Sequence, residues 1–301
     1  MQLMSRWPEP LARAYGACEA LVQSHEENFP VASRLLPASM RPHVAAVYAF
    51  ARVADDFADE GTAAPSARQA RLQAWQARLH EAVANVSRPR APVSRDELLC
   101  FALAHSIRSL DLPVSLFDDL LSAFGQDTTT TRYGSWRDVL DYCRRSANPI
   151  GRLVLRIAGY RNDTLDRSSD ALCTALQLTN FWQDFGRDWR AGRLYVPRDV
   201  QDACGAREAD LAAETVSSEW VRAIDACIDT TASLFAEGRA VCDGVGGRLK
   251  LELRFTWLGG RRILERVHAR KAELLRSRPI LRARDVPLLV WRAACWGRGA
   301  V

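Results

Sequence analysis

Residues 177–188 read Gln177-Leu178-Thr179-Asn180-Phe181-Trp182-Gln183-Asp184-Phe185-Gly186-Arg187-Asp188. The stretch has no proline and one glycine, and we expect it to form a helix. At about 100° per residue, Gln177, Asn180, Asp184 and Asp188 fall within roughly 80° of arc. Two carboxylates and two amides therefore share one stripe. Like charges one turn apart repel each other unless a cation lies between them.

A second stretch with a helical pattern, residues 48–60, carries a matching cluster. Its polar side chains share one broad face: Tyr48, Arg52, Asp55, Asp56 and Asp59. Ala, Val, Phe and Tyr surround them almost all the way round, which is typical of a buried helix. Carboxylates in such a helix are costly unless they are paired or bound to a metal. We expect the two acidic helices to face each other across a cavity.

Two such clusters predict a site for divalent metal ions. The expected ligands are Asp55, Asp59, Asn180, Asp184 and Asp188, and Asp56 joins them as a catalytic candidate. Oxygen ligands without nearby His or Cys indicate Mg²⁺, or else Mn²⁺, rather than zinc. Mg²⁺ held by a few carboxylates takes further ligands from phosphate, so the predicted substrate is a phosphate or diphosphate ester. The alternative is that each cluster is only a solvated helix face.

Composition favours an all-α fold. The 301 residues are 48% hydrophobic, which is ample for a core, and Gly and Pro mark the ends of periodic segments. The length allows one large domain or two small ones. The net charge of +5, from 41 basic and 36 acidic residues, is mild. We expect no nucleic-acid partner, because no Lys/Arg run is interleaved with aromatics.

The cysteines give an expectation about the compartment. All eight are scattered, without a CxxC pair, which is typical of a reduced, cytoplasmic protein. No signal segment is recognisable at the start of the sequence. No apolar run approaches the roughly 20 residues that a membrane-spanning helix needs.

The two acidic motifs resemble the paired aspartate-rich motifs of the squalene/phytoene synthase family. Residues 55–59 match the first motif and residues 180–188 the second, and the order and spacing fit from about residue 15 to residue 296. The resemblance implies one domain over residues 1–301, an isoprenoid-synthase helical bundle with a central active-site cavity. One branch of the family, the bacterial hydroxysqualene synthases of hopanoid biosynthesis, is indicated by residues 25–33, 146–151 and 180–184.

Substrate contacts come partly from the stripes above and partly from the resemblance. The candidates are His25, Phe29, Tyr48, Arg52, Arg145, Gln177, Gln183, Arg193, Tyr195 and Arg282, with Arg278 as an alternative to Arg282. The apolar lining is expected from Phe29, Phe50, Phe57, Phe181 and Trp182. A capping or surface role for His25 and a surface role for Arg193 stay open, and Tyr133 belongs either near the site or to a surface turn.

Two positions depart from the family pattern. Arg145 stands where squalene- and presqualene-forming members usually carry a Tyr that is associated with the cyclopropane-forming half-reaction, and Gln183 stands where they usually carry Arg. The resemblance therefore implies that the enzyme starts from presqualene diphosphate. It would make hydroxysqualene by diphosphate ionisation, cation rearrangement and water capture, with Mg²⁺ and without NAD(P)H.

Several alternatives remain. The chain could be a presqualene diphosphate, squalene or phytoene synthase, or a non-catalytic assembly-factor relative. All five aspartates of the two motifs are present, which favours catalysis. The resemblance also implies two neighbouring enzymes of the same pathway, presqualene diphosphate synthase and hydroxysqualene oxidoreductase. Physical association of this protein with either enzyme is an expectation that rests only on that shared pathway.

Two further segments carry structural expectations. Asn148-Pro149 and Gly151 predict a kink in a helix over residues 135–158. Residues 285–296 are apolar and aromatic with flanking arginines. We expect Leu288, Leu289 and Trp291 to pack in the core, and the alternative is that this segment rests on a membrane surface, at the inner face of the membrane.

Overall fold

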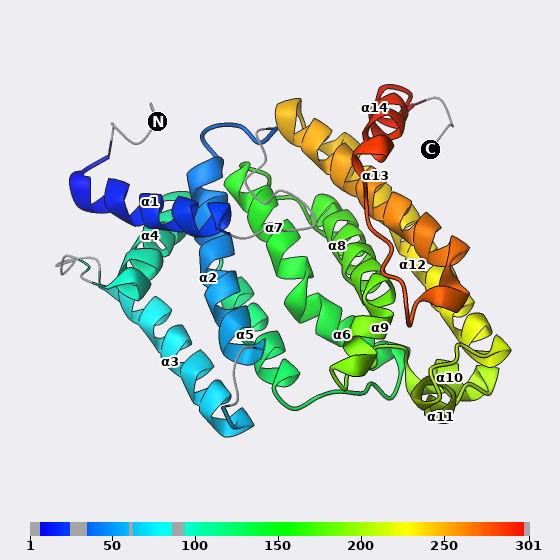
Figure 1. The fold of residues 1–301 in the computed structure, drawn as a ribbon. Helices are drawn as coiled ribbons and strands as arrows, with labels where there is room; N and C mark the ends of the chain where they lie inside the picture. The colour runs from blue at the N-terminus through cyan, green and yellow to red at the C-terminus, as the bar shows by residue number, and fades with distance from the viewer. Residues whose placement is uncertain (1–6, 25–34, 60–62, 86–91, 93, 298–301) are drawn as a thin grey trace. The chain divides into compact units, whose positions relative to one another are not determined.

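The computed structural model describes residues 7–24, 35–59, 63–85, 92 and 94–297. These residues form helices joined by turns and loops, and their one isolated β-bridge joins Arg132 to Leu194 (Figure 1). The all-α prediction is therefore confirmed. None of the described helices is both long enough and apolar enough to cross a bilayer.

The chain forms two compact units, each described here by itself. The first contains the described residues up to Thr129 together with Arg152–Arg161. The second contains Thr130–Gly151 and the described residues from Asn162 onward. The expectation of one domain over residues 1–301 stays a prediction.

In the first unit, helix α2 lies at the centre. The helices that lie wholly in this unit are α1 (Glu9–Gln23), α2 (Arg41–Asp59), α3 (Pro65–Ala84), α4 (Arg95–Leu110) and α5 (Ser115–Asp127). Helix α2 packs against the other four. Phe50 on α2 is fully buried, with its ring 5.3 Å from Trp75 and 5.7 Å from Phe117, centroid to centroid. The indole Nε1 of Trp75 donates to the carbonyl of Phe50, which fixes α3 on α2.

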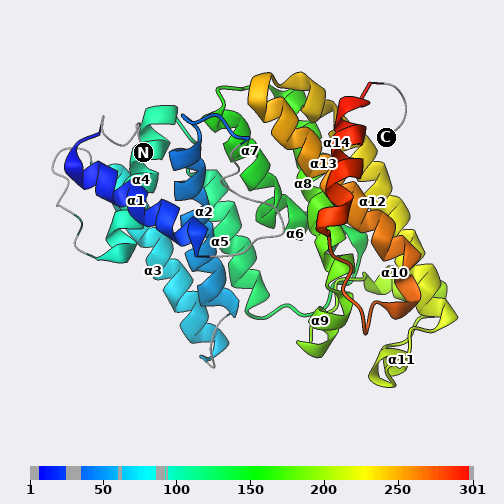
Figure 2. The same ribbon diagram turned by 45° about the horizontal axis from the view of Figure 1, so that its top comes forward.

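The second unit is built around α8 and α12 (Figure 2). Its larger helices are α6 (Trp136–Ser146), α8 (Asp163–Gln183), α12 (Ser218–Gly244) and α13 (Gly247–Ala269). Its shorter elements are α9 (Phe185–Arg190), α10 (Arg198–Cys204), α11 (Glu208–Ala212), η2 (Lys271–Glu273), η3 (Ala283–Asp285) and α14 (Val286–Ala294).

Glycines set how closely these helices approach. A Cβ on Gly238 of α12 would lie 2.6 Å from the backbone nitrogen of Leu172 on α8. A Cβ on Gly260 of α13 would lie 2.5 Å from a methyl of Leu176 and 2.8 Å from the ring of Phe235. A larger residue at Gly238 would push on the backbone of α8, and one at Gly260 would displace the side chains of Leu176 and Phe235, because non-bonded heavy atoms repel each other well below about 3.5 Å.

The predicted kink is confirmed. Helix α6 begins after Ser135, whose side chain accepts from the backbone of Asp138, and it ends at Ser146. Helix α7 (Asn148–Ile157) follows after the single residue Ala147. Proline cannot donate a backbone hydrogen bond, so the break falls at Asn148-Pro149, where the sequence placed it.

One expectation about the C-terminal segment is wrong. Leu289 of α14 is buried and Leu288 is half-buried, but the indole of Trp291 is 54% exposed. The reason is helical spacing: Trp291 lies two residues from Leu289, which is about 200° round the helix, so the two side chains point to opposite sides.

A buried polar cluster ties α1, α2 and α4 together in the first unit. The hydroxyl of Tyr15 lies 3.2 Å from Nδ1 of His43, 2.9 Å from Nδ1 of His105 and 2.7 Å from Oγ of Ser106. Burial, and then the charge of His105, lowers the pKa of His43 from 6.5 to about 4. Burial, and then the charge of Arg108, also lowers the pKa of His105.

We expect this cluster to make the protein acid-sensitive. The folded state keeps His43 neutral, so below about pH 6.5 the unfolded chain binds the extra proton and stability falls toward pH 4. Thermal unfolding measured from pH 7 to pH 4 should show a steeper loss of Tm for the wild type than for His43→Gln. The exposed His268 gives a control, since His268→Gln should keep the wild-type slope. Equal slopes for wild type and His43→Gln would contradict this role.

Candidate active site

The first acidic motif occupies the last two turns of α2. The Arg52 guanidinium lies 3.1 Å from Oδ2 of Asp55 and 2.6 Å from Oδ1 of Asp56. Burial acts to lower the pKa of Arg52, but the charges of Asp55 and Asp56 outweigh it and the pKa is raised. Tyr48 is half-buried one turn earlier, and Asp59 is exposed at the end of the helix. An arginine of the same helix thus supplies the positive charge that paired carboxylates require.

The second motif is not one continuous helix, contrary to the prediction. Helix α8 ends at Gln183, Asp184 has φ −94° and ψ 9°, and α9 begins at Phe185. The polar stripe nevertheless continues, because the backbone N–H of Asp184 donates to Asn180 and that of Asp188 donates to Asp184, both at 2.8 Å. The break coincides with contacts to a segment that crosses over the motif, residues 274–279, hereafter the crossing segment.

Side chains of the motif bind the crossing segment. The Arg278 guanidinium binds both carboxylate oxygens of Asp184, with Nη2 3.2 Å from Oδ2. The amide Nε2 of Gln183 donates to the carbonyl of Pro279 at 2.6 Å, and Arg190 donates to the carbonyl of Leu275. Two-point pairing fixes the orientation of the guanidinium as well as its position.

Asp184 and Gln183 are among the few buried polar side chains of the described residues, with exposed fractions of 8% and 4%. A buried carboxylate is strongly destabilising when its partner is removed. The pairing with Arg278 is therefore a structural requirement at this position as long as no other cation takes its place.

A cluster of aromatic rings lies beside the motif on α8. The ring of Phe181 stacks on Tyr195 at 3.7 Å between centroids and 5° between planes. Tyr133 and Tyr142 contact the same Tyr195 ring at 5.6 and 6.3 Å. The sequence left Tyr133 open between the site and a surface turn, and the structure buries it in this cluster.

The other aromatic residues expected to form the lining are packed inside their units. Trp182 is buried, and its indole Nε1 donates to Thr231 at 2.8 Å. Phe50 is buried in the first unit, and the half-buried Phe57 ring meets Trp75 edge-on. Their role in lining a cavity stays a prediction.

The remaining candidates are more scattered. Arg145 binds Asp141 on the same helix, with Nη2 3.0 Å from Oδ2. The backbone N–H of Arg193 donates to the carbonyl of Asp188 at 2.8 Å, which ties this arginine to the motif. Arg282 is exposed just before η3, four residues after Arg278 in a stretch that is not helical. Gln177 is half-buried on α8, and His25 and Phe29 lie outside the described residues.

The structure leaves the metal site a prediction. Within the described ranges, no three His, Cys, Asp or Glu side chains gather closely enough to hold an ion. The two acidic motifs belong to different units, so their predicted facing arrangement also stays a prediction. The donor chemistry fits a hard cation, because Asn180, Asp184 and Asp188 offer oxygen atoms on successive turns. In this structure the guanidinium of Arg278 is the positive group beside the Asp184 carboxylate.

Known proteins resemble this chain over most of its length. The family model of squalene/phytoene synthase matches residues 22–291. The chain belongs to the squalene/phytoene synthase family. It is an enzyme of this family, as its relatives indicate.

Three relatives illustrate the family match. The hydroxysqualene synthase of Zymomonas mobilis is 40% identical over 211 residues, covering 69% of this chain and 67% of that protein. The hydroxysqualene synthase of Rhodopseudomonas palustris is 34% identical over 261 residues, covering 85% of both. A crystal structure described as squalene synthase HpnC from Alicyclobacillus acidocaldarius is 37% identical, with a TM-score of 0.80 over 89% of this chain and 97% of that one.

The pairing of Asp184 with Arg278 is not predicted from the sequence. From the family resemblance, Arg278 is expected, as an alternative to Arg282, only to contact the diphosphate. The one signal in the sequence is Pro279, because proline disfavours helical backbone at the residue before it, here Arg278. The hydrogen bond from Gln183 to the crossing segment had no signal in the sequence.

Gly186 permits the crossing segment to lie on α9. A Cβ at this position would lie 2.5 Å from the carbonyl oxygens of Leu274 and Leu275. We expect Gly186→Ala to push the crossing segment away and to cost about 1–3 kcal/mol of unfolding free energy, as overpacking does. Chemical denaturation measures this cost.

Gly16 of α1 provides the matched control. A Cβ there meets nothing within 4 Å, and the residue lies inside a helix. Gly16→Ala should therefore stabilise the protein, by about 0.5–1 kcal/mol. A Gly186→Ala variant as stable as Gly16→Ala would mean that the crossing segment does not rest on Gly186.

Proposed function

We propose that this enzyme converts presqualene diphosphate to hydroxysqualene in a Mg²⁺-dependent reaction. Support comes from the two relatives named hydroxysqualene synthase, of which one covers 85% of the chain. The family name and the acidic motifs support a prenyl diphosphate as the substrate class. The proposal needs a site that accepts a diphosphate and shelters a carbocation.

The observation that carries the proposal is the pairing of Asp184 with Arg278 beside an aromatic stack. A buried carboxylate and a guanidinium meet in two-point contact. Phe181, one turn before Asp184 on α8, stacks on Tyr195 from the loop that follows α9. The carboxylate suits a metal ion, the guanidinium suits diphosphate oxygens, and the rings suit a cation. Neighbouring residues of one unit therefore carry side chains suited to each of these three roles, which supports the proposal.

Each residue then has a role. Asn180, Asp184 and Asp188, together with Asp55 and Asp59 of the first motif, would hold the metal. Mg²⁺ bound there supplies positive charge that stabilises the departing diphosphate. When diphosphate binds, Arg278 exchanges part of its contact with Asp184 for the diphosphate oxygens, and Arg193 is the second candidate donor.

The reaction is redox-neutral in this proposal. The bond between carbon and the diphosphate oxygen breaks, and the electron pair leaves with diphosphate. The cyclopropylcarbinyl cation rearranges beside the aromatic cluster, where one ring face near a cation contributes up to about 2 kcal/mol in a dry site. Water then forms the new carbon–oxygen bond and loses its proton. Because water rather than hydride captures the cation, no NAD(P)H is consumed.

Two residues support presqualene diphosphate over farnesyl diphosphate. Arg145, in place of the family's usual Tyr, is engaged with Asp141. Gln183, in place of the usual Arg, is buried and uses its amide to hold the crossing segment. A second candidate, squalene synthase, is favoured by the name given to the Alicyclobacillus structure. A reaction that supplies presqualene diphosphate and one that consumes hydroxysqualene must act in the same cell.

Removing the carboxylate charge tests the metal role. We expect Asp184→Asn to lower Mg²⁺-dependent diphosphate release at least about 100-fold, since transition-state charge then loses its support. Released diphosphate is measured with purified enzyme, and circular dichroism checks that the variant folds. Asp202 forms an exposed ion pair with Arg198, so Asp202→Asn is the matched control and should stay within about twofold. An Asp184→Asn enzyme as active as this control would remove Asp184 from the site.

The substrate is tested separately. Purified enzyme with Mg²⁺ receives presqualene diphosphate in one reaction and farnesyl diphosphate in another, both without NADPH. We expect hydroxysqualene from presqualene diphosphate and no C30 product from farnesyl diphosphate. Formation of presqualene diphosphate from farnesyl diphosphate would instead favour the second candidate, while the family assignment would stand.

A further inference from the structure

Helix α14 presents an apolar face to solvent. Val286, Val290 and Trp291 have exposed fractions of 55%, 50% and 54%, and the neighbouring Pro287 and Ala294 are exposed as well. The spacings of four and five residues place these side chains on one side of the helix. We call these five residues the α14 face. It contains three of the six large hydrophobic side chains that are exposed among the described residues.

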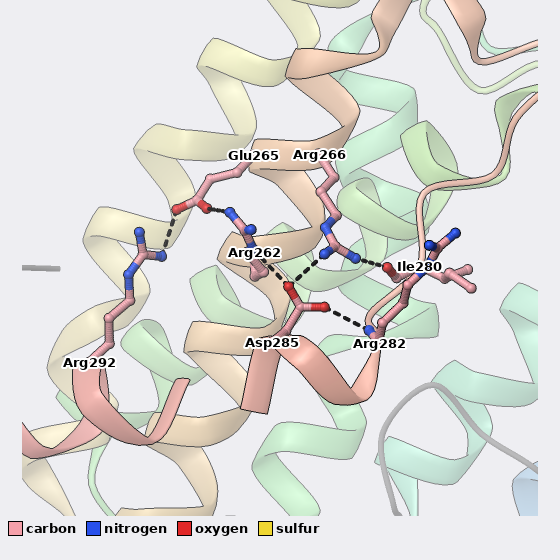
Figure 3. Close-up of polar contacts among 7 residues, drawn as sticks. All are labelled: Arg262, Glu265, Arg266, Ile280, Arg282, Asp285 and Arg292. Atoms are coloured by element: carbon pink, nitrogen blue, oxygen red, sulfur yellow. Dashed lines mark hydrogen bonds and ion pairs between the residues drawn. The ribbon is translucent and has the colours of Figure 1, made fainter. Parts of the chain in front are cut away.

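The opposite side of α14 is fixed to α13 at its start. The buried Asp285 accepts from Arg262 Nε at 3.2 Å and from Arg266 Nη2 at 2.6 Å (Figure 3). Its other oxygen accepts from the backbone N–H of Arg282 at 2.7 Å. Burial acts to raise the pKa of Asp285, but the hydrogen bonds from Arg282 and Arg262 outweigh it and the pKa is lowered. Asp285 therefore stays charged and holds its two arginines.

Two more contacts hold the rest of the segment. Arg292 of α14 binds Glu265 of α13 at 2.7 Å, and Glu265 also binds Arg262 at 2.8 Å (Figure 3). Beyond the helix, the indole of the buried Trp296 donates to Asp243 at 3.1 Å. Asp285, Leu289, Arg292 and Trp296 thus follow each other at helical spacing on the inner side. The outward direction of the α14 face is a consequence of these contacts.

The chain around this face is strongly basic. From residue 276 to the end, the sequence has six arginines and one acidic residue, Asp285. Two of the six, Arg278 and Arg292, pair with Asp184 and Glu265. The Asp285 carboxylate is buried and paired, so it does not offset the surface charge. Arg282 and Arg284 are exposed immediately before the helix. The apolar face, with its tryptophan, suits a partner with an apolar interior. The exposed arginines beside it suit negative charge on the surface of that partner.

We propose that the α14 face binds the surface of an anionic lipid bilayer. Val286, Val290 and Trp291 enter the boundary between headgroups and acyl chains, and Arg284 with its neighbours contacts the headgroup phosphates. The helix has nine residues and is too short to span, so it lies in the plane of the surface. A second copy of this chain fits less well, because a two-fold contact would set the two arginine groups against each other. This proposal is independent of the proposed reaction.

Vesicle sedimentation tests the proposal with the full chain. The probes are vesicles of phosphatidylcholine alone and vesicles that also contain phosphatidylglycerol. We expect binding to the anionic vesicles that weakens at high salt, and at least tenfold weaker binding for the double variant Val290→Ser, Trp291→Ser. Leu251, 44% exposed on α13, gives the matched control, and Leu251→Ser should bind like the wild type.

Charge and self-association are tested in the same preparation. Arg284→Gln should weaken binding to anionic vesicles about fivefold, which is the contribution of one arginine to binding at such a surface. The same substitution should not change thermal stability. Light scattering in solution gives the mass of the wild type. The proposal would be overturned if the wild-type protein bound neither kind of vesicle. A dimer that Trp291→Ser converts to a monomer would also overturn it, because the α14 face would then be a protein interface.

Discussion

A buried carboxylate needs a positive charge beside it, and this requirement governs the second unit around Asp184. Arg278 supplies the charge, and to do so the chain must return from the end of α13 and cross over α9. Gly186 gives the crossing segment room, and Gln183 and Arg190 bind its carbonyl groups. The break in the helix at Asp184 belongs to the same set of contacts.

The same chemistry recurs in both units. Arg52 pairs with two carboxylates of the first motif, as Arg278 pairs with Asp184 of the second. At the first motif the guanidinium lies between two carboxylates that would otherwise repel each other. At the second motif it pairs with a carboxylate that is buried away from water. We interpret these arginines as partners that a metal ion and a diphosphate can jointly replace, since the arginines also suit phosphate oxygens. The acidic motifs can then be stable before substrate arrives.

Much of the fold could be predicted from the sequence, because helices follow from local patterns. Ser135 and Asn148-Pro149 carry short-range signals, and the structure places helix ends there. The break at Asp184 coincides with a contact to a segment about 90 residues further along the chain. The exposure of Trp291 depends on which side of α14 is anchored to the rest of the unit. Such contacts leave no periodic signal. The acidic stripes identified the candidate site, but the pairing of Asp184 with Arg278 required the structure.

We propose that Asp184 exchanges Arg278 for a divalent cation when diphosphate binds. Anomalous scattering from crystals of this protein soaked with Mn²⁺ and inorganic diphosphate tests this exchange. We expect a Mn²⁺ peak within coordination distance of the Asp184 carboxylate, with Arg278 turned toward diphosphate oxygens. A bound Mn²⁺–diphosphate that leaves Asp184 fully paired with Arg278 would contradict it.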